Sequence, residues 1–472
     1  MTELHDLSAL EQAEAVRRRE VSPVDLVEHY LERIARHNDE LGAFVTVAAD
    51  AARERAGEAE RAVLAGDELP PLHGVPTAIK DLNLTAGIRT TFGSRLFADF
   101  VPPIDDYVVD KLRQAGTISL GKTNTPEFGL SCYSENDVAP PARLPWDPAL
   151  SPGGSSGGAA AAVAAGLASL AQGSDGGGSI RTPSSLCGLV GIKVSRGRVS
   201  NGPVGGDITG LAWNGPIART VADAAALLDA MAGPMPGDPH WAPPLRPGET
   251  FLGHASRPIS SLRIGRFAVP PVPDAVVDQE CRAAWEDAST LLADAGHDVE
   301  DIEPPLPPDL IPMFEVLWTV ATHGIPIDPD RQSELTPLTR WLRERGGAVS
   351  GAGYVQALGA LQAASRRAII ATAGYDAVLC PTVAMRARPV GWFTETGDPA
   401  EDFERQKRFT PFTAIYNITG QPSISVPLYT SGDGLPVGVM LSGRPAQETT
   451  LISLAAQLEA MRPWRDRHPA TW

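Results

Sequence analysis

The chain has 472 residues, 43% of them hydrophobic, and its 57 acidic against 40 basic side chains give a formal net charge of −17. This negative balance opposes non-specific binding to nucleic acid or to an anionic membrane surface, and it favours a small-molecule substrate. The length allows a large core, which we expect to form one α/β domain rather than two or three.

The N-terminal region predicts two helices and lacks the apolar stretch of a signal peptide or a membrane span. Ser8 followed by Glu11 is the pattern of a capping box, and Ser22-Pro23 marks a second helix start. The second helix carries apolar residues at helical spacing, namely Val27, Tyr30, Leu31 and Ile34. We expect a cytoplasmic protein with these helices in its outer layer.

Short apolar runs alternate with helical stretches in residues 74–193. Residues 75–79 predict a strand, residues 106–114 a helix, and residues 117–120 a further strand. This alternation is typical of an α/β sheet.

Two serine-bearing glycine loops follow, Gly153-Gly154-Ser155-Ser156-Gly157-Gly158 and Gly176-Gly177-Gly178-Ser179. Between them, residues 159–165 predict a helix, Gly166 a turn, and residues 167–171 a strand. A helix of about ten residues extends roughly 15 Å, and about five extended residues return roughly 16 Å. We therefore expect the two loops to meet in space.

The second half of the chain returns to the sheet after a helical region. The proline-rich residues 233–247 predict a surface connection, and residues 300–366 are mostly helical. The expected elements around them are a strand at 262–267, a helix at 276–295, and strands at 377–379, 423–428 and 437–441. The sheet is thus predicted to draw strands from both ends of the chain.

Residues 116–123 match the phosphate-loop pattern GxxxxGK[ST], so an ATPase has to be considered. A phosphate loop follows a strand and opens a helix. Here a predicted helix precedes the pattern, residues 117–120 are strand-like, and Pro126 follows soon after. The context favours a helix-to-strand turn at Gly116 over a nucleotide site.

The first glycine loop also fits GxSxG, the nucleophile elbow of α/β-hydrolases. An elbow needs a preceding strand, whereas residues 145–152 form a proline-rich loop. None of the nine histidines stands in a sequence context that marks a catalytic base. A histidine-dependent triad is therefore the weaker hydrolase interpretation.

Lys80 is the candidate base for a serine hydrolase without histidine. It ends the strand predicted at 75–79 and precedes Asp81 and Asn83, which could orient it. Desolvation would lower the lysine pKa and supply a neutral amine near pH 7. Taken alone, Lys80 would be interpreted as an ordinary lysine reaching out from a strand end.

The glycines before Ser179 suit an oxyanion hole, because Gly176, Gly177 and Gly178 allow a tight backbone whose N–H groups point at one spot. A metal-dependent alternative lacks support in the sequence. The cysteines are isolated from one another and from any histidine cluster, which argues against a zinc site and a disulfide framework: Cys132, Cys187, Cys281 and Cys380.

These motifs, in this order and spacing, resemble the amidase signature family. The resemblance rests on Lys80-Asp81, on residues 121–124, and on the loops at 151–158 and 173–181. It extends to residues 215–220, 375–382 and 419–422, and so covers nearly the whole chain.

The resemblance implies that Ser179 is the acylating nucleophile, Lys80 the general base, and Ser155 the relay between them, following a cis peptide bond. It assigns the amides of residues 176–179 to the oxyanion hole and supporting roles to Ser156, Asp175 and Arg181. It implies hydrolysis of a small linear amide with no cofactor and no metal.

The resemblance also implies an organisation for the whole chain. The expected fold is a single domain, residues 1–472, with a central mixed twisted sheet covered by helices on both faces. A signature core spans about 70–220, a helical and pocket-forming region about 240–366, and C-terminal strands with a helix about 367–462. A homodimer is a further expectation.

Departures from the family pattern qualify the resemblance. Leu144-Pro145-Trp146 stands where relatives carry Asn-Pro-Trp or Asn-Pro-Tyr, and Gly176 where a larger residue is common. Residues 209–216 lack the run typical of the amidotransferase subunit that amidates glutamyl-tRNA, which disfavours that subunit. An amidotransferase or amide-forming enzyme, and a catalytically silent binding protein, stay open as alternatives.

The sequence offers only candidates for the substrate pocket. They share apolar character, which suggests an aryl or alkyl amide rather than a charged one. They are Leu130, Cys132, Trp213, Trp318, Phe409, Phe412 and Tyr416.

Overall fold

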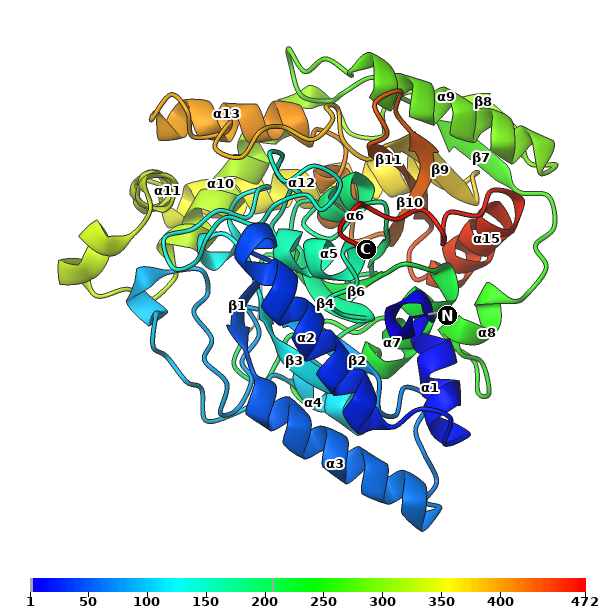
Figure 1. Cartoon of the computed structure of the whole chain (residues 1–472). Helices are drawn as coiled ribbons and strands as arrows, with labels where there is room; N and C mark the ends of the chain where they lie inside the picture. Colours follow the sequence, from blue (N-terminus) through cyan, green and yellow to red (C-terminus); the bar gives the residue numbers. More distant parts are fainter. Residues whose placement is uncertain (1–2, 206–207) are drawn as a thin grey trace.

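The computed structural model describes residues 3–205 and 208–472, and eleven strands within them form one mixed sheet (Figure 1). The order across the sheet is β1-β3-β2-β4-β6-β5-β10-β11-β9-β7-β8. The strands are β1 (Phe44–Val47), β2 (Pro76–Lys80), β3 (Ile118–Thr123), β4 (Leu170–Asp175), β5 (Val190–Lys193), β6 (Trp213–Ala218), β7 (Arg263–Arg266), β8 (Asp298–Asp301), β9 (Ala377–Pro381), β10 (Ser423–Thr430) and β11 (Pro436–Gly443).

Helices of widely different length surround the sheet (Figure 1). The α-helices are α1 (Ala9–Arg17), α2 (Pro23–Leu41), α3 (Ala49–Ala65), α4 (Tyr107–Gln114), α5 (Gly157–Ala164), α6 (Arg181–Cys187), α7 (Val221–Met231), α8 (Phe251–Ala255), α9 (Gln279–Asp294), α10 (Ile311–His323), α11 (Pro337–Gly347), α12 (Gly351–Thr372), α13 (Pro399–Phe409), α14 (Ala414–Thr419) and α15 (Glu448–Met461). Short 3-10 helices are η1 (Leu4–Asp6), η2 (Arg95–Phe97), η3 (Glu127–Gly129), η4 (Pro308–Leu310) and η5 (Pro329–Glu334).

The sheet combines parallel and antiparallel pairs, as predicted. β2 runs parallel to both β3 and β4, and β7 runs parallel to both β8 and β9. The central strands, from β4 through β6, β5, β10 and β11 to β9, pair antiparallel. Because β10 and β11 lie between β5 and β9, the last part of the chain completes the sheet begun by the first. The fold is therefore a single α/β domain.

Consecutive strand residues belong to different hydrophobic clusters, which shows that both sheet faces are covered. Leu170 packs in the cluster that contains α7 residues, and the next residue, Ala171, packs in the cluster that contains α5. Ile79 and Ala78 divide in the same way. Since successive side chains of a strand point to opposite faces, α7 and α5 lie on opposite sides of the sheet.

Most elements predicted by periodicity and capping are confirmed. Ser8 and Glu11 form the expected capping box, and the Ser22 hydroxyl accepts a hydrogen bond from Val24 N–H at the start of α2. The sequence analysis did not predict β1, β5, β6 or β8. Three of these strands have four residues, and β6 contains Gly215 and Pro216, so none gives a clear alternating pattern.

The pattern at residues 116–123 is a turn followed by a strand, as the sequence context favoured. Gly116 has a φ of 82° between α4 and β3, a conformation that suits glycine. Lys122 is a buried β3 residue whose ammonium group donates to the hydroxyls of Thr85 and Thr90 at 3.0 Å. Lys122 therefore fixes the loop that carries Thr85 and Thr90, and it does not itself project from a loop.

The two ends of the described chain lie together. The ring of His5 in η1 lies 4.9 Å from that of Trp472. A search of the described residues for a helix with the length and apolar character needed to cross a bilayer found none.

Candidate active site

Lys80 is the last residue of β2 and is fully buried. Its strand lies parallel to β4, with Thr77 opposite Leu170, so the carboxyl ends of both strands reach the same edge of the sheet. β4 ends there with Ser174 and Asp175. Formation of β2 thus places Lys80 at the edge of the sheet where the second glycine loop begins.

The first glycine loop brings Ser155 to Lys80. The Gly154–Ser155 peptide bond is cis, and α5 begins two residues after Ser155. Lys80 Nζ donates to Ser155 Oγ at 2.7 Å and also contacts Ser174, at 3.0 Å to Oγ and 3.2 Å to the carbonyl oxygen. These three oxygens are the polar surroundings of a buried amine.

Burial lowers the pKa of Lys80 to about 7, although the nearby negative charge of Asp175 opposes the shift. The neutral amine is therefore well populated around neutral pH. A neutral lysine can accept a proton from a hydroxyl, which a protonated lysine cannot do.

The second glycine loop lies against the first. Ser156 N–H donates to the carbonyl oxygen of Ser179 at 3.1 Å, and the Ser156 hydroxyl donates to the carbonyl oxygen of Ser174 at 3.2 Å. The two glycine loops thus meet in space, as the sequence predicted, with Lys80 bonded to Ser155 of the first loop. Ser179 lines an open pocket, whereas Ser155 is 2% exposed and is not part of the lining.

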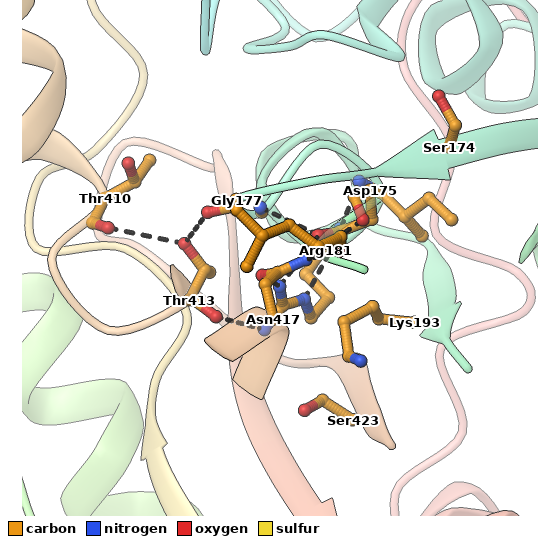
Figure 2. A network of polar contacts seen from close by, with 12 residues as sticks. Ser174, Asp175, Gly177, Arg181, Lys193, Thr410, Thr413, Asn417 and Ser423 are labelled. Atoms are coloured by element: carbon orange, nitrogen blue, oxygen red, sulfur yellow. Dashed lines mark hydrogen bonds and ion pairs between the residues drawn. The ribbon is translucent and has the colours of Figure 1, made fainter. Parts of the chain in front are cut away.

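A buried network fixes the shape of the second loop (Figure 2). Asp175 accepts hydrogen bonds from the backbone N–H groups of Gly178 and Ile180, at 2.8 and 3.1 Å. Arg181 pairs with Asp175 through two nitrogens, at 2.8 and 2.9 Å, and both side chains are fully buried. The carboxylate therefore holds the loop on both sides of Ser179.

The charge of Asp175 is stabilised by its neighbours. Burial alone would raise the pKa of this carboxyl, but the charge and hydrogen bonds of Arg181, with a further hydrogen bond from Asn417, outweigh burial and hold the pKa well below its usual range. Asp175 is thus an anion at neutral pH. The Asp175–Arg181 pair is a fixed support and not a proton-transfer group.

The loop amides correct one part of the oxyanion prediction. Gly178 N–H is directed at Asp175 Oδ1 and so is not available to a substrate oxygen in this arrangement. In the part of the chain that the structure describes, the amides of Gly176, Gly177 and Ser179 have no hydrogen-bond acceptor. Thr413 Oγ1 donates to the Gly177 carbonyl oxygen at 2.5 Å and fixes that peptide plane (Figure 2).

An open pocket lies in front of Ser179, and its space of about 920 Å³ includes open solvent. Most of its lining is apolar, as is usual for small-molecule sites. α10 and α13 contribute to its walls, together with the two glycine loops. The lining includes Leu130, Cys132, Phe314, Trp318, Gln406 and Lys407.

The candidate pocket residues divide into two groups. Leu130, Cys132 and Trp318 line the pocket. The other candidates lie outside its lining, because their rings fill the core: Trp213, Phe409, Phe412 and Tyr416 are each at most 5% exposed. Phe412, for example, packs on Phe267 at 6.0 Å between ring centroids.

Three residues that contact Lys80 or the second glycine loop were not predicted from the sequence. The sequence does carry a signal for Ser174, because it is a polar residue at the end of β4, directly before Asp175. Thr413 and Asn417, next to and within α14, carry no local signal. Asn417 donates to the carbonyl oxygen and to Oδ1 of Asp175, 242 positions away, at 3.0 and 2.9 Å.

A possible metal-ligand group lies elsewhere in the molecule. Among the described residues, Glu3, His5 and His29 form the one set of three such side chains whose ligand atoms are close enough to share an ion. No member of this set lines the pocket in front of Ser179.

Known proteins are similar to this chain over nearly its full length. A family model described as Amidase matches residues 25–452. A putative amidase of Synechocystis sp. is 37% identical over 466 residues, covering 97% of this chain and 89% of the relative. An acylamidase of Rhodococcus erythropolis is 35% identical over 486 residues, covering 100% and 99%. The solved structure of a 6-aminohexanoate cyclic dimer hydrolase complexed with substrate matches with a TM-score of 0.91 and 32% identity, covering 99% of this chain and 100% of that one.

Proposed function

This chain belongs to the amidase family, and we propose that it hydrolyses the C–N bond of a small carboxamide through an acyl-enzyme on Ser179. The observation that carries the proposal is the 2.7 Å contact between Lys80 Nζ and Ser155 Oγ, made by a lysine whose pKa burial lowers to about 7. A buried amine of this kind is equipped to take a proton from serine.

In the acylation step, Ser179 Oγ attacks the amide carbonyl carbon and forms the C–O bond. Its proton passes to Ser155, whose own proton passes to the neutral amine of Lys80. The negative oxygen of the tetrahedral intermediate is stabilised by the free amides of Gly176, Gly177 and Ser179. The resulting Lys80 ammonium is held by Ser155 and Ser174.

In the following steps, the proton returns. The Lys80 ammonium gives it back through Ser155 to the leaving nitrogen as the C–N bond breaks and the amine departs. Water then attacks the acyl-enzyme, and the same relay takes the proton of the water and returns one to Ser179. No cofactor is required for this cycle.

Ser156, Asp175 and Arg181 support the reaction without taking part in bond making. Ser156 links the two glycine loops through Ser174 and Ser179. Asp175 and Arg181 hold the loop amides by the buried ion pair described above. We expect changes at these three residues to lower turnover through loss of loop geometry.

The substrate is a small neutral amide. The apolar lining favours apolar groups, and Lys407, the one charged side chain among the described lining residues, is already paired with Glu315 at 2.5 Å. A charged substrate group would have to break that pair or be buried alone, which is costly. The expected cytoplasmic location and homodimeric state stay predictions.

Trapping of the acyl-enzyme tests the proposal. The protein is mixed with a panel of amides, quenched with acid and digested, and the mass of the peptide that contains Ser179 is measured together with the amine released. The expected result is acylation of Ser179 and release of amine at matching rates. Amine release without modification of Ser179 would contradict the mechanism, and release only in the presence of an added acyl acceptor would indicate an amide-forming enzyme.

A further inference from the structure

We infer that the rings of Phe314 and Trp318 form an aromatic plate that binds a flat aromatic ring of the substrate next to Ser179, so that the preferred substrates are aryl amides. The inference rests on the proposed function and narrows its substrate class. It assigns Trp318 as a specificity-determining residue.

The two rings belong to one helix and face one way. Phe314 and Trp318 are four residues apart on α10, a spacing that places them on the same helical face. Their ring centroids lie 5.6 Å apart with an angle of 20° between the planes. Both rings line the pocket that contains Ser179 and stand nearly parallel, so an aromatic ring that enters the pocket can add to their stack.

The plate lies directly against the second glycine loop. A Cβ atom placed on Gly176 would lie 3.4 Å from the Trp318 ring, and one placed on Gly177 would lie 3.8 Å from the Phe314 ring. The rings are therefore in van der Waals range of the loop that carries the nucleophile. Gly176 leaves room for the indole, since any larger side chain there would compete with Trp318 for the same space.

Two polar side chains in the rest of the lining already have partners. Lys407 pairs with Glu315, and the Gln406 amide already accepts from Cys132 N–H at 3.1 Å and donates to Asp402 at 2.8 Å. Apolar residues make up much of the remaining lining, with Leu130, Leu306 and Ile415 among them. A neutral aromatic ring stacked on the plate suits this lining, because an aromatic pair contributes to binding beyond the apolar area that it buries.

Trp341 provides a matched control. It lies on α11 in the same hydrophobic cluster as Trp318, where it packs on Phe403 at 5.7 Å between ring centroids. It does not line the pocket of Ser179. Replacing it removes an indole of equal size without touching the proposed plate.

The experiment compares flat and puckered rings of similar size. Wild type, Trp318→Leu and Trp341→Leu are assayed with benzamide against cyclohexanecarboxamide, and with acetanilide against N-cyclohexylacetamide. In at least one pair, Trp318→Leu should lower kcat/KM for the aromatic member about tenfold more than for its saturated partner, while Trp341→Leu keeps the wild-type ratio within about twofold. Comparing each variant with wild type removes the difference in intrinsic reactivity between the substrates.

Binding to a Ser179→Ala variant separates failure of the inference from failure of the proposed function. Calorimetry should give tighter binding of benzamide or acetanilide than of the saturated partner, and the preference should disappear in Ser179→Ala/Trp318→Leu. If the protein hydrolyses the amides and Trp318→Leu lowers kcat/KM equally for both members of each pair, the inference about the plate is wrong while the proposed amidase activity stands. Aromatic-selective binding by a protein that hydrolyses none of the amides would support the plate and contradict the proposed amidase activity. If Trp318→Leu does not fold, Phe314→Leu carries the same comparison.

Discussion

Lys80 Nζ lies 2.7 Å from Ser155 Oγ, although the two residues are 75 positions apart in the sequence. The contact forms because β2 ends where the first glycine loop turns toward α5. Lys80 approaches from the interior of the sheet, and the pocket opens beyond Ser179. This contact is the basis for the proposed role of Ser155 as an intermediary between the buried amine and Ser179.

The pH dependence of activity should follow the protonation of Lys80. Burial lowers its pKa to about 7, so the neutral base is lost as the pH falls through that value. One pH unit below the pKa, only about a tenth of the amine is neutral. The value of kcat/KM for an uncharged amide should rise through pH 7 and then level off. A flat profile between pH 5.5 and 9 would contradict this role.

Lys80→Arg should lose activity almost as completely as Lys80→Ala, because guanidinium stays protonated and cannot accept the serine proton. Ser155→Ala should be less damaging than Lys80→Ala, since water can enter the vacated position. We expect Lys80→Arg to retain less than about a tenth of wild-type kcat/KM, a loss of more than about 1.4 kcal/mol. Lys122→Arg is the control for a buried lysine, and it should leave the acid limb of the profile where it was. If Lys80→Arg retains more than this fraction of wild-type kcat/KM at raised pH, the general base is another group.

Ser179→Ala should abolish turnover of every amide while leaving the fold intact, because it removes the group that forms the acyl-enzyme. Ser184→Ala is the matched control: Ser184 lies on α6 next to this loop, is fully buried, and its hydroxyl has no partner among the described residues. Steady-state amine release and circular dichroism check both variants. Wild-type activity in a Ser179→Ala preparation free of contaminating enzyme would refute the mechanism.

Asp175→Asn should destabilise the protein, because it leaves the buried Arg181 cation without its counter-charge. Breaking a buried ion pair in this way costs about 3–5 kcal/mol. Glu334→Gln breaks a partly exposed ion pair, whose side chains are 46% and 37% exposed, and should barely change stability since water screens those charges. Urea unfolding curves measure both variants. Equal midpoints for Asp175→Asn and wild type would show that the pair does not hold the loop.

Chelation should leave amidase activity unchanged, because the residues at the pocket supply hydroxyl, amine and amide chemistry. His323→Ala should also retain activity: its ring contacts the Arg343 carbonyl oxygen at 2.9 Å, outside the pocket lining. Activity is measured after dialysis against EDTA and again after adding zinc. A loss on dialysis that zinc restores would indicate a metallohydrolase.

The sequence by itself predicted the features that depend on neighbours along the chain. The capping box at Ser8, the strand ending at Lys80 and the helix between the glycine loops follow from spacing and periodicity, and the structure contains all three. The α/β class followed from the same alternation. Lysine and both serine loops could be recognised because each is a short contiguous motif.

Tertiary structure decided what depends on residues far apart. Asn417 and Thr413 support the second loop across more than 200 positions, and no local pattern marks either residue. The aromatic candidates were alike in sequence, yet Trp318 lines the pocket while Phe412 and Tyr416 are core residues. Whether an apolar ring faces a cavity or the interior depends on how helices pack on the sheet. Gly178 N–H donates to Asp175 because the loop closes around that carboxylate. These contacts exist only once the chain has folded.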